Sequence, residues 1–203
     1  MDLSPVILSS ESVNDPTPPR LLLITGRPGS GKTTLVAEVA AAVGGRAGGF
    51  YTQEIRAQGR RVGFEVVTLE GRRGRLAHVE ARGPYRVGKY GVDLESFEAT
   101  GVDALERAIR EKDLILIDEV GKMELFSERF RRAVEAAVNS GKPVLAAVML
   151  GPDPWVDRLK AHPEARLILL TPENRAQVRA EVRAWLKEWG LLAEAPSSPR
   201  PPG

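Results

Sequence analysis

An eight-residue segment near the start of the chain has the spacing of a phosphate-binding loop. It reads Gly26-Arg27-Pro28-Gly29-Ser30-Gly31-Lys32-Thr33 and fits the pattern G-x-x-x-x-G-K-[ST]. The glycines allow backbone torsions closed to other residues, so main-chain N–H groups can reach phosphate oxygens. The lysine of such a loop neutralises the β- and γ-phosphates, and the threonine hydroxyl is a ligand of Mg²⁺. The segment predicts binding of a nucleoside triphosphate with Mg²⁺, the alternative being a chance match in a glycine-rich loop.

A pair of acidic residues farther along the chain supplies the second half of this chemistry. Residues 114–117 read Leu-Ile-Leu-Ile, which is typical of a buried strand, and Asp118 and Glu119 follow directly. An acid at this position holds Mg²⁺, usually through water, and the carboxylate beside it can orient and deprotonate an attacking water molecule. We predict Asp118 as a magnesium ligand and Glu119 as the general base; the alternative is that Glu119 only caps or pairs at the strand end.

Apolar runs and helical patterns alternate around these motifs. Short runs without polar residues are typical of strands buried in a parallel sheet, and strand–helix alternation places helices on both of its faces. We therefore predict an α/β fold with a mostly parallel sheet and a small antiparallel β insertion near residues 50–90. The expected strands are 21–24, 49–55, 62–69, 75–79, 114–117, 144–148 and 167–170; the expected helices are 31–43, 102–110, 127–139, 155–161 and a last one from Thr171-Pro172-Glu173 to about Gly190.

Composition bounds the domain and removes several classes of function. The folded domain is expected to span residues 20–192, because 1–19 and 193–203 are rich in Ser and Pro and read as disordered flanks. The chain has no Cys and only two His, which excludes disulfides and Cys-based zinc sites. Without an apolar run near ~20 residues or a signal peptide, we expect a soluble, cytoplasmic protein without membrane contact. With a net charge of only +2, binding to nucleic acid is possible but not favoured. The sequence leaves the oligomeric state open, and we favour a monomer.

Six segments together resemble the THEP1-type nucleoside-triphosphatase family. They are ITGRPGSGKTTL at 24–35, GGFYTQEIR at 48–56, VGFEVVTLEG at 62–71, YGVDLESFE at 90–98, IDEVGKMELFS at 117–127 and TPENR at 171–175. The resemblance spans nearly the whole predicted domain and departs from the family pattern at 149–154. It implies a single P-loop domain with a RecA-like sheet. It also implies slow, Mg²⁺-dependent hydrolysis of several nucleoside triphosphates, ATP, GTP, CTP and UTP among them, to the diphosphate and phosphate.

The resemblance further implies that two segments hold the nucleotide. Thr33 and Asp118 are predicted to hold the metal, and Lys32 and Glu119 to act in catalysis. We predict a catalytic role for Lys122 too, as a positive charge near the γ-phosphate; the alternative is a surface lysine paired with Glu124. The predicted nucleotide-binding residues are Gly26, Arg27, Pro28, Gly29, Ser30, Gly31, Lys32, Thr33, Thr34, Asp118, Glu119, Val120, Gly121, Lys122, Met123 and Glu124.

Three groups outside these segments admit two interpretations each. Glu54 or Arg56 is predicted to face the phosphates, or both form a solvated pair on a strand. Asn174 and Arg175 lie near the base or ribose, or only occupy the first turn of the last helix. Arg72, Arg73, Arg75, Arg82 and Arg86 form a lid or a nucleic-acid patch, or, as we favour, a solvated hairpin face.

Hydrolysis is the favoured function, and two rivals use the same phosphate cradle. A small-molecule kinase transfers the γ-phosphoryl group to an alcohol or phosphate acceptor, whereas a nucleotide-dependent switch binds RNA, DNA or a protein and uses slow hydrolysis as its timer. The Asp118-Glu119 pair favours water as the acceptor. The chain has no N-K-x-D sequence of the kind that selects guanine in some GTPases, which argues against a specificity restricted to GTP.

Overall fold

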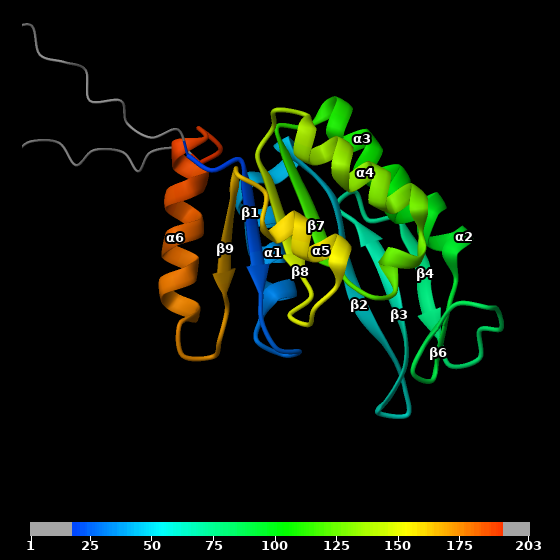
Figure 1. Cartoon of the computed structure of the whole chain (residues 1–203). Coiled ribbons are helices and arrows are strands. Elements are labelled where there is room, and N and C mark those ends of the chain that lie inside the picture. The colour runs from blue at the N-terminus through cyan, green and yellow to red at the C-terminus, as the bar shows by residue number, and fades with distance from the viewer. Residues whose placement is uncertain (1–17, 193–203) are drawn as a thin grey trace, which may run out of the picture.

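The computed structural model describes residues 18–192 of the chain. Apart from Pro18 and Pro19, the predicted flanks 1–19 and 193–203 lie outside the described residues. One sheet of nine strands runs through the described part, in the order β5-β6-β4-β3-β2-β7-β8-β1-β9 (Figure 1). The strands are β1 (Leu21–Thr25), β2 (Ala47–Ala57), β3 (Arg60–Thr68), β4 (Arg73–His78), β5 (Arg86–Val87), β6 (Tyr90–Val92), β7 (Leu114–Val120), β8 (Val144–Val148) and β9 (Ala165–Leu169).

Half of this sheet is parallel and half is antiparallel. Strands β2, β7, β8, β1 and β9 pair in parallel. The apolar runs of β1, β7 and β8 are buried on both faces, as the sequence predicts. The buried strand predicted at 167–170 is wrong in its burial, because β9 lies at the edge of the sheet and leaves Leu167 and Leu169 exposed. Beyond β2, the strands β3, β4, β6 and β5 continue the same sheet in antiparallel pairs. The predicted antiparallel insertion is confirmed, but it is larger than expected because residues 86–92 add two short strands.

Helices cover both faces of the sheet, as predicted. Side chains alternate along a strand, so Leu21 and Leu23 join one core with α3, α4 and α5, whereas Leu22 and Ile24 join the other core with α1 and α6 (Figure 1). None of the helices within residues 18–192 is long and apolar enough to span a membrane. The helices are α1 (Lys32–Val43), α2 (Leu94–Phe97), α3 (Asp103–Glu111), α4 (Glu128–Asn139), α5 (Pro154–Lys160) and α6 (Arg175–Glu188), with short helical turns η1 (Gly44–Arg46), η2 (Glu98–Val102) and η3 (Glu124–Phe126).

The predicted start of the last helix at Thr171-Pro172-Glu173 is wrong. The helix α6 begins at Arg175, and residues 171–174 form a turn before it. The reason is the side chain of Asn174, whose Oδ1 accepts a hydrogen bond from Thr171 N at 2.8 Å while Nδ2 donates to Leu169 O at 2.7 Å. An asparagine side chain that bonds to nearby backbone in this way stabilises a turn in place of a helical turn.

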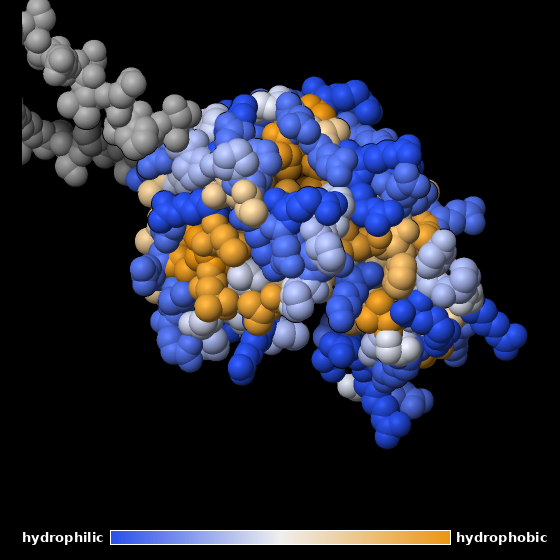
Figure 2. Space-filling model, viewed as in Figure 1, coloured by the Kyte–Doolittle hydropathy of each residue, from blue (hydrophilic) through white to orange (hydrophobic). Residues whose placement is uncertain are grey.

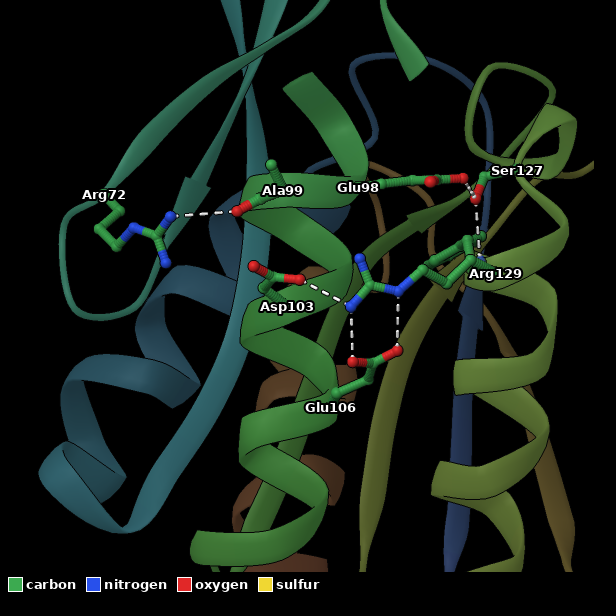
Figure 3. Close-up of polar contacts among 8 residues, drawn as sticks. Arg72, Glu98, Ala99, Asp103, Glu106, Ser127 and Arg129 are labelled. Carbon is green, nitrogen blue, oxygen red and sulfur yellow. Dashed lines mark hydrogen bonds and ion pairs between the residues drawn. The ribbon is translucent and has the colours of Figure 1, made fainter. Parts of the chain in front are cut away.

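Polar contacts hold the helix that follows the β7 loop. Ser127 caps α4 by accepting a hydrogen bond from Phe130 N at 3.0 Å, and its hydroxyl donates to Glu98 (Figure 3). The guanidinium of Arg129 spans to α3, where it donates to both carboxylate oxygens of Glu106 and to Asp103 (Figure 3). These contacts fix α4 against α3 and thereby fix the end of the loop that leaves β7.

Replacing Ser127 by alanine is expected to destabilise the fold. The variant loses the N-cap of α4 and leaves Glu98 without its hydroxyl partner, so the free energy of unfolding should fall by about 1–2 kcal/mol. Urea denaturation of wild type and Ser127→Ala measures this. Arg132→Ala is the matched control, because it removes only an exposed ion pair within the same helix and should cost under about 0.5 kcal/mol. Equal losses in the two variants would contradict the capping role.

Candidate functional site

The loop between β1 and α1 has the backbone that a phosphate cradle needs. Gly29 and Gly31 have φ values of +79° and +111°, which residues with a side chain rarely adopt. Gly31 is also the N-cap residue of α1. A Cβ on Gly26 would lie 2.4 Å from Leu170 O, so only glycine fits there. The helix N-terminus and its free N–H groups therefore face the space above the loop, as an anion site requires.

Lys32 reaches from the first turn of α1 into the middle of this site. Its Nζ donates to Gly26 O at 3.0 Å and lies 3.6 Å from Glu119 Oε2. The lysine is buried, whereas the side chain of Glu119 is 31% exposed. The contact joins the two predicted segments across one strand, because β8 lies between β1 and β7.

Asp118 is buried beneath the same point with one oxygen free. Its Oδ2 accepts a hydrogen bond from Thr52 N at 3.5 Å, and Oδ1 has no hydrogen-bond partner among the described residues. Burial raises the pKa of Asp118 to about 6, against the lowering effect of a hydrogen bond from Thr33. A buried, unpaired carboxylate oxygen beside a threonine hydroxyl suits a hard cation such as Mg²⁺.

Glu124 adds a third carboxyl group to this region. The turn after β7 folds it back, so that a Cβ on Gly121 would lie 3.0 Å from Glu124 Oε2 and 3.4 Å from Glu119 Oε1. Burial, together with the charges of Glu119 and Asp118, raises the pKa of Glu124 to about 8. Glu124 is therefore a neutral acid at neutral pH in the nucleotide-free protein, which explains how it can lie beside two other acids.

A cavity of about 720 Å³ opens in front of these groups, within the range of small-molecule sites. Figure 2 shows a notch in the surface beside the projecting β2–β3 hairpin. Of the predicted residues, Pro28, Gly29, Gly31, Lys32, Thr33, Thr34, Glu119 and Met123 line it. The lining does not include Gly26, Arg27, Ser30, Asp118, Val120, Gly121, Lys122 and Glu124. Six of these are buried, namely Gly26, Ser30, Asp118, Val120, Gly121 and Glu124.

Arg175 ties the last helix to the P-loop. Its Nε donates to Ser30 O at 2.7 Å and a terminal nitrogen donates to Gly29 O at 2.9 Å. With both carbonyls held from outside, the N–H groups of the loop are left to face the cavity. Arg175 also lines the cavity, whereas Asn174 forms the turn described above. Arg175 thus occupies the first turn of α6 and also supports the nucleotide loop, and its place near the base or ribose stays a prediction.

The remaining groups named from the sequence lie at or outside the rim. Glu54 and Arg56 form an exposed ion pair on β2, in keeping with the interpretation as a solvated pair. Glu54 also lines the cavity, and a role facing the phosphates stays a prediction. Lys122 is exposed in the turn after β7, outside the cavity lining, and its catalytic role stays a prediction. The lining contains none of the arginines 72, 73, 75, 82 and 86, and Arg73 pairs with Glu65 on the hairpin, in keeping with a solvated face.

Several residues of the site were not named from the sequence. Thr52 contacts Asp118 through its backbone, which no side-chain pattern reveals. Arg61, Phe64 and Tyr90 come from β3 and β6 and meet only because the antiparallel strands continue the sheet. The cavity lining also includes Gln53, Val87, Gly88, Leu170 and Arg179.

The glycine loop, the buried lysine and the acids on the neighbouring strand define a P-loop nucleoside-triphosphate site on an α/β sheet. Residues 21–183 match the model of a protein family described as NTPase. The chain is 47% identical over 166 residues to the nucleoside-triphosphatase THEP1 of Thermotoga sp. strain RQ2, covering 82% of this chain and 95% of that protein. The chain belongs to the THEP1 family of nucleoside-triphosphatases, which confirms the resemblance found in the sequence.

Two solved structures share the fold. The crystal structure of THEP1 from the hyperthermophile Aquifex aeolicus superposes with a TM-score of 0.76 at 39% identity, covering 82% of this chain and 98% of that one. The solution structure of a human cancer-related nucleoside triphosphatase gives a TM-score of 0.71 at 35% identity, covering 83% of this chain and 97% of that one. The predicted P-loop fold with its mixed sheet is thereby confirmed.

Replacing Arg175 by alanine is expected to weaken nucleotide binding. The carbonyls of Gly29 and Ser30 lose a charged donor, the loop loses its support, and the affinity for a triphosphate should fall about 10-fold or more. Titration calorimetry with a non-hydrolysable ATP analogue measures this. Arg183→Ala, an exposed arginine on the same helix, is the control and should bind as wild type does. Wild-type affinity in Arg175→Ala would remove the role in loop positioning.

The raised pKa of Glu124 predicts how stability depends on pH. Between about pH 5 and 8 the folded protein keeps a proton that the unfolded chain releases, so the free energy of unfolding should fall as pH rises. In Glu124→Gln this contribution is absent and the slope should be shallower, with the remainder coming from Asp118. Urea denaturation of nucleotide-free protein across this range tests it, with exposed Glu111→Gln as control. Identical slopes in wild type and Glu124→Gln would contradict the assignment.

Proposed function

We propose that the chain hydrolyses nucleoside triphosphates to the diphosphate and phosphate, that it requires Mg²⁺, and that it accepts several bases. One observation carries the proposal: a partly exposed carboxylate, Glu119, lies on the cavity wall 3.6 Å from the P-loop lysine. A γ-phosphate bound at Lys32 is therefore next to an acceptor for the proton of an attacking water molecule.

Each group at the site has a distinct task in this reaction. The N–H groups of the loop hold the β-phosphate, and the Lys32 ammonium neutralises charge that develops on the transferred phosphoryl group. Glu119 orients the attacking water and takes its proton. Attack forms the bond from the water oxygen to the γ-phosphorus, and the bond from that phosphorus to the bridging oxygen breaks.

The metal fits the residues that surround Asp118. The Thr33 hydroxyl and the unpaired Asp118 carboxylate oxygen would hold Mg²⁺, which when bound supplies positive charge to the phosphate oxygens. No three carboxylate or imidazole side chains converge into a metal-binding group within residues 18–192. The other ligands would accordingly be phosphate oxygens and water, as in other sites where Mg²⁺ accompanies a nucleotide.

A broad base specificity agrees with the wall on the nucleoside side. There the cavity is lined by Leu170, Arg175 and Arg179, and Arg175 already binds P-loop carbonyls while Arg179 pairs with Glu38. An apolar residue and two engaged cations offer contact to any base without a donor and acceptor pattern that selects one. The chain has no N-K-x-D string for guanine either.

Phosphate release from ATP, GTP, CTP and UTP tests the proposal. Wild type is expected to release phosphate from all four with Mg²⁺ and to stop when the metal is chelated. Glu119→Gln should bind the nucleotides but turn over about 10² to 10⁴-fold more slowly, since the amide cannot accept the proton. Binding is measured for both proteins by calorimetry.

Two further variants make the result specific. Glu128→Gln removes an exposed carboxylate on α4 and should retain wild-type turnover. Lys122→Ala should lose turnover with unchanged affinity if its charge reaches the γ-phosphate, and it should resemble wild type if Lys122 is a surface lysine. Nucleotide binding without phosphate release in wild type would refute hydrolysis as the function.

A further inference from the structure

The cavity extends beyond the place where a γ-phosphate is held. In the sheet, β9 flanks β1 on one side, whereas β8, β7 and β2 follow in turn on the other. Asp118 and Glu119 on β7 mark the γ end of a bound triphosphate, so its nucleoside extends the opposite way, towards β9 and Arg175. The wall formed by β2, β3 and the β5–β6 turn is then left free for another molecule.

Two aromatic rings and a guanidinium form this free wall. Phe64 and Tyr90 meet edge to face with ring centroids 5.2 Å apart, and Arg61 lies 5.2 Å from the centroid of Phe64 and 5.8 Å from that of Tyr90. Arg61 Nε also donates to the Tyr90 hydroxyl at 3.0 Å, which fixes the plane of the guanidinium. All three residues line the cavity. Aromatic faces and fixed guanidinium planes of this kind are surfaces on which flat heteroaromatic rings stack.

A carboxylate lies beside these rings. Glu54 is opposite Phe64 in the register of the β2–β3 hairpin and accepts a hydrogen bond from Arg61 at 2.8 Å. Hydrogen bonds from Arg61 and then Arg56 lower the pKa of Glu54, so it remains an acceptor across the neutral range. Gln53 also lines the cavity, but its amide oxygen accepts a hydrogen bond from Arg73 at 3.4 Å. The polar edge of a nucleobase carries donors from which a carboxylate such as Glu54 can accept hydrogen bonds.

The strand β2 connects this wall to the reacting end of the site. Thr52 N donates to Asp118 at 3.5 Å, and Glu54 is two residues farther along the strand, about 7 Å away. A ring stacked at Phe64 therefore lies beside the same strand that contacts Asp118. The projecting hairpin is visible in Figure 1, and the notch beside it is visible in the space-filling view of Figure 2.

Building on the proposed function, we propose that the wall of Arg61, Phe64 and Tyr90 binds a nucleoside as a second substrate. A hydroxyl group of this nucleoside accepts the γ-phosphoryl group of the triphosphate. The hydroxyl oxygen forms a bond to the γ-phosphorus while the bond from that phosphorus to the β–γ bridging oxygen breaks. Glu119 takes the hydroxyl proton. The products are the nucleoside diphosphate and a nucleoside monophosphate, and water takes the place of the hydroxyl when no nucleoside is bound.

Product analysis with ATP labelled at the γ-phosphate tests this. Adenosine, guanosine, cytidine and uridine are each added to wild type with Mg²⁺, and labelled nucleoside monophosphate is separated from labelled phosphate. At least one nucleoside should yield labelled monophosphate at the expense of free phosphate. No monophosphate from any of the four, with phosphate release continuing, overturns the second substrate and leaves hydrolysis standing. Absence of both products overturns hydrolysis itself.

Variants of the wall test its location. Phe64→Leu keeps an apolar side chain but removes the stacking ring, and Arg61→Gln removes the guanidinium of a side chain that is 45% exposed. Each should raise the KM for the nucleoside about 5- to 100-fold, the range expected for one lost stacking partner. Arg73→Gln, an exposed arginine of the next strand that lies outside the cavity, should keep the wild-type KM. Wild-type KM values in both wall variants would overturn the assignment of the wall.

Discussion

The Lys32 ammonium is held almost out of reach of water, and the architecture around it serves to keep that charge paired. A buried lysine is stable only with partners, and here they are the carbonyl of Gly26 and the carboxylate of Glu119. The first comes from the lysine's own loop and the second from a strand two places away in the sheet. The position of β8 between β1 and β7 sets that separation. The pairing of the Lys32 charge with Glu119 therefore depends on the order of the strands in the sheet.

Acidic side chains outnumber basic ones around Lys32, and this excess negative charge suits a substrate that binds together with a divalent cation. Asp118, Glu119 and Glu124 face one buried ammonium, and the imbalance is relieved by keeping Glu124 protonated and by raising the pKa of Asp118. A nucleotide that arrives with a divalent cation supplies positive charge to Asp118 and negative charge to Lys32. The free protein thus has unbalanced charges at the site, and binding of its proposed substrate with the cation would balance them.

Local pattern predicted the parallel strands, both motifs and the helices that cover the sheet. The apolar runs at 21–24 and 114–117 allow few structures other than buried strands, and glycines at fixed offsets leave little freedom to the loop. The start of α6 was misplaced because the Asn174 side chain bonds to backbone that a helical turn would use. Proline is common both in turns and in the first turn of a helix, so Pro172 could not tell the two apart. The aromatic wall could not be predicted, because Arg61 and Phe64 on β3 meet Tyr90 on β6 only through the register of two antiparallel strand pairs, β3–β4 and β4–β6.

The strand that carries the P-loop is translated early but finds its partners late. β1 pairs only with β8 and β9, which begin at Val144 and Ala165, and the loop is then braced by Arg175. A ribosome must therefore deliver about three quarters of the described chain before the first strand has a neighbour. Until then the loop has no rigid base, and long-range pairing of this kind slows folding. Nucleotide capture is in consequence a property of the finished polypeptide, and a nascent or C-terminally clipped chain lacks it.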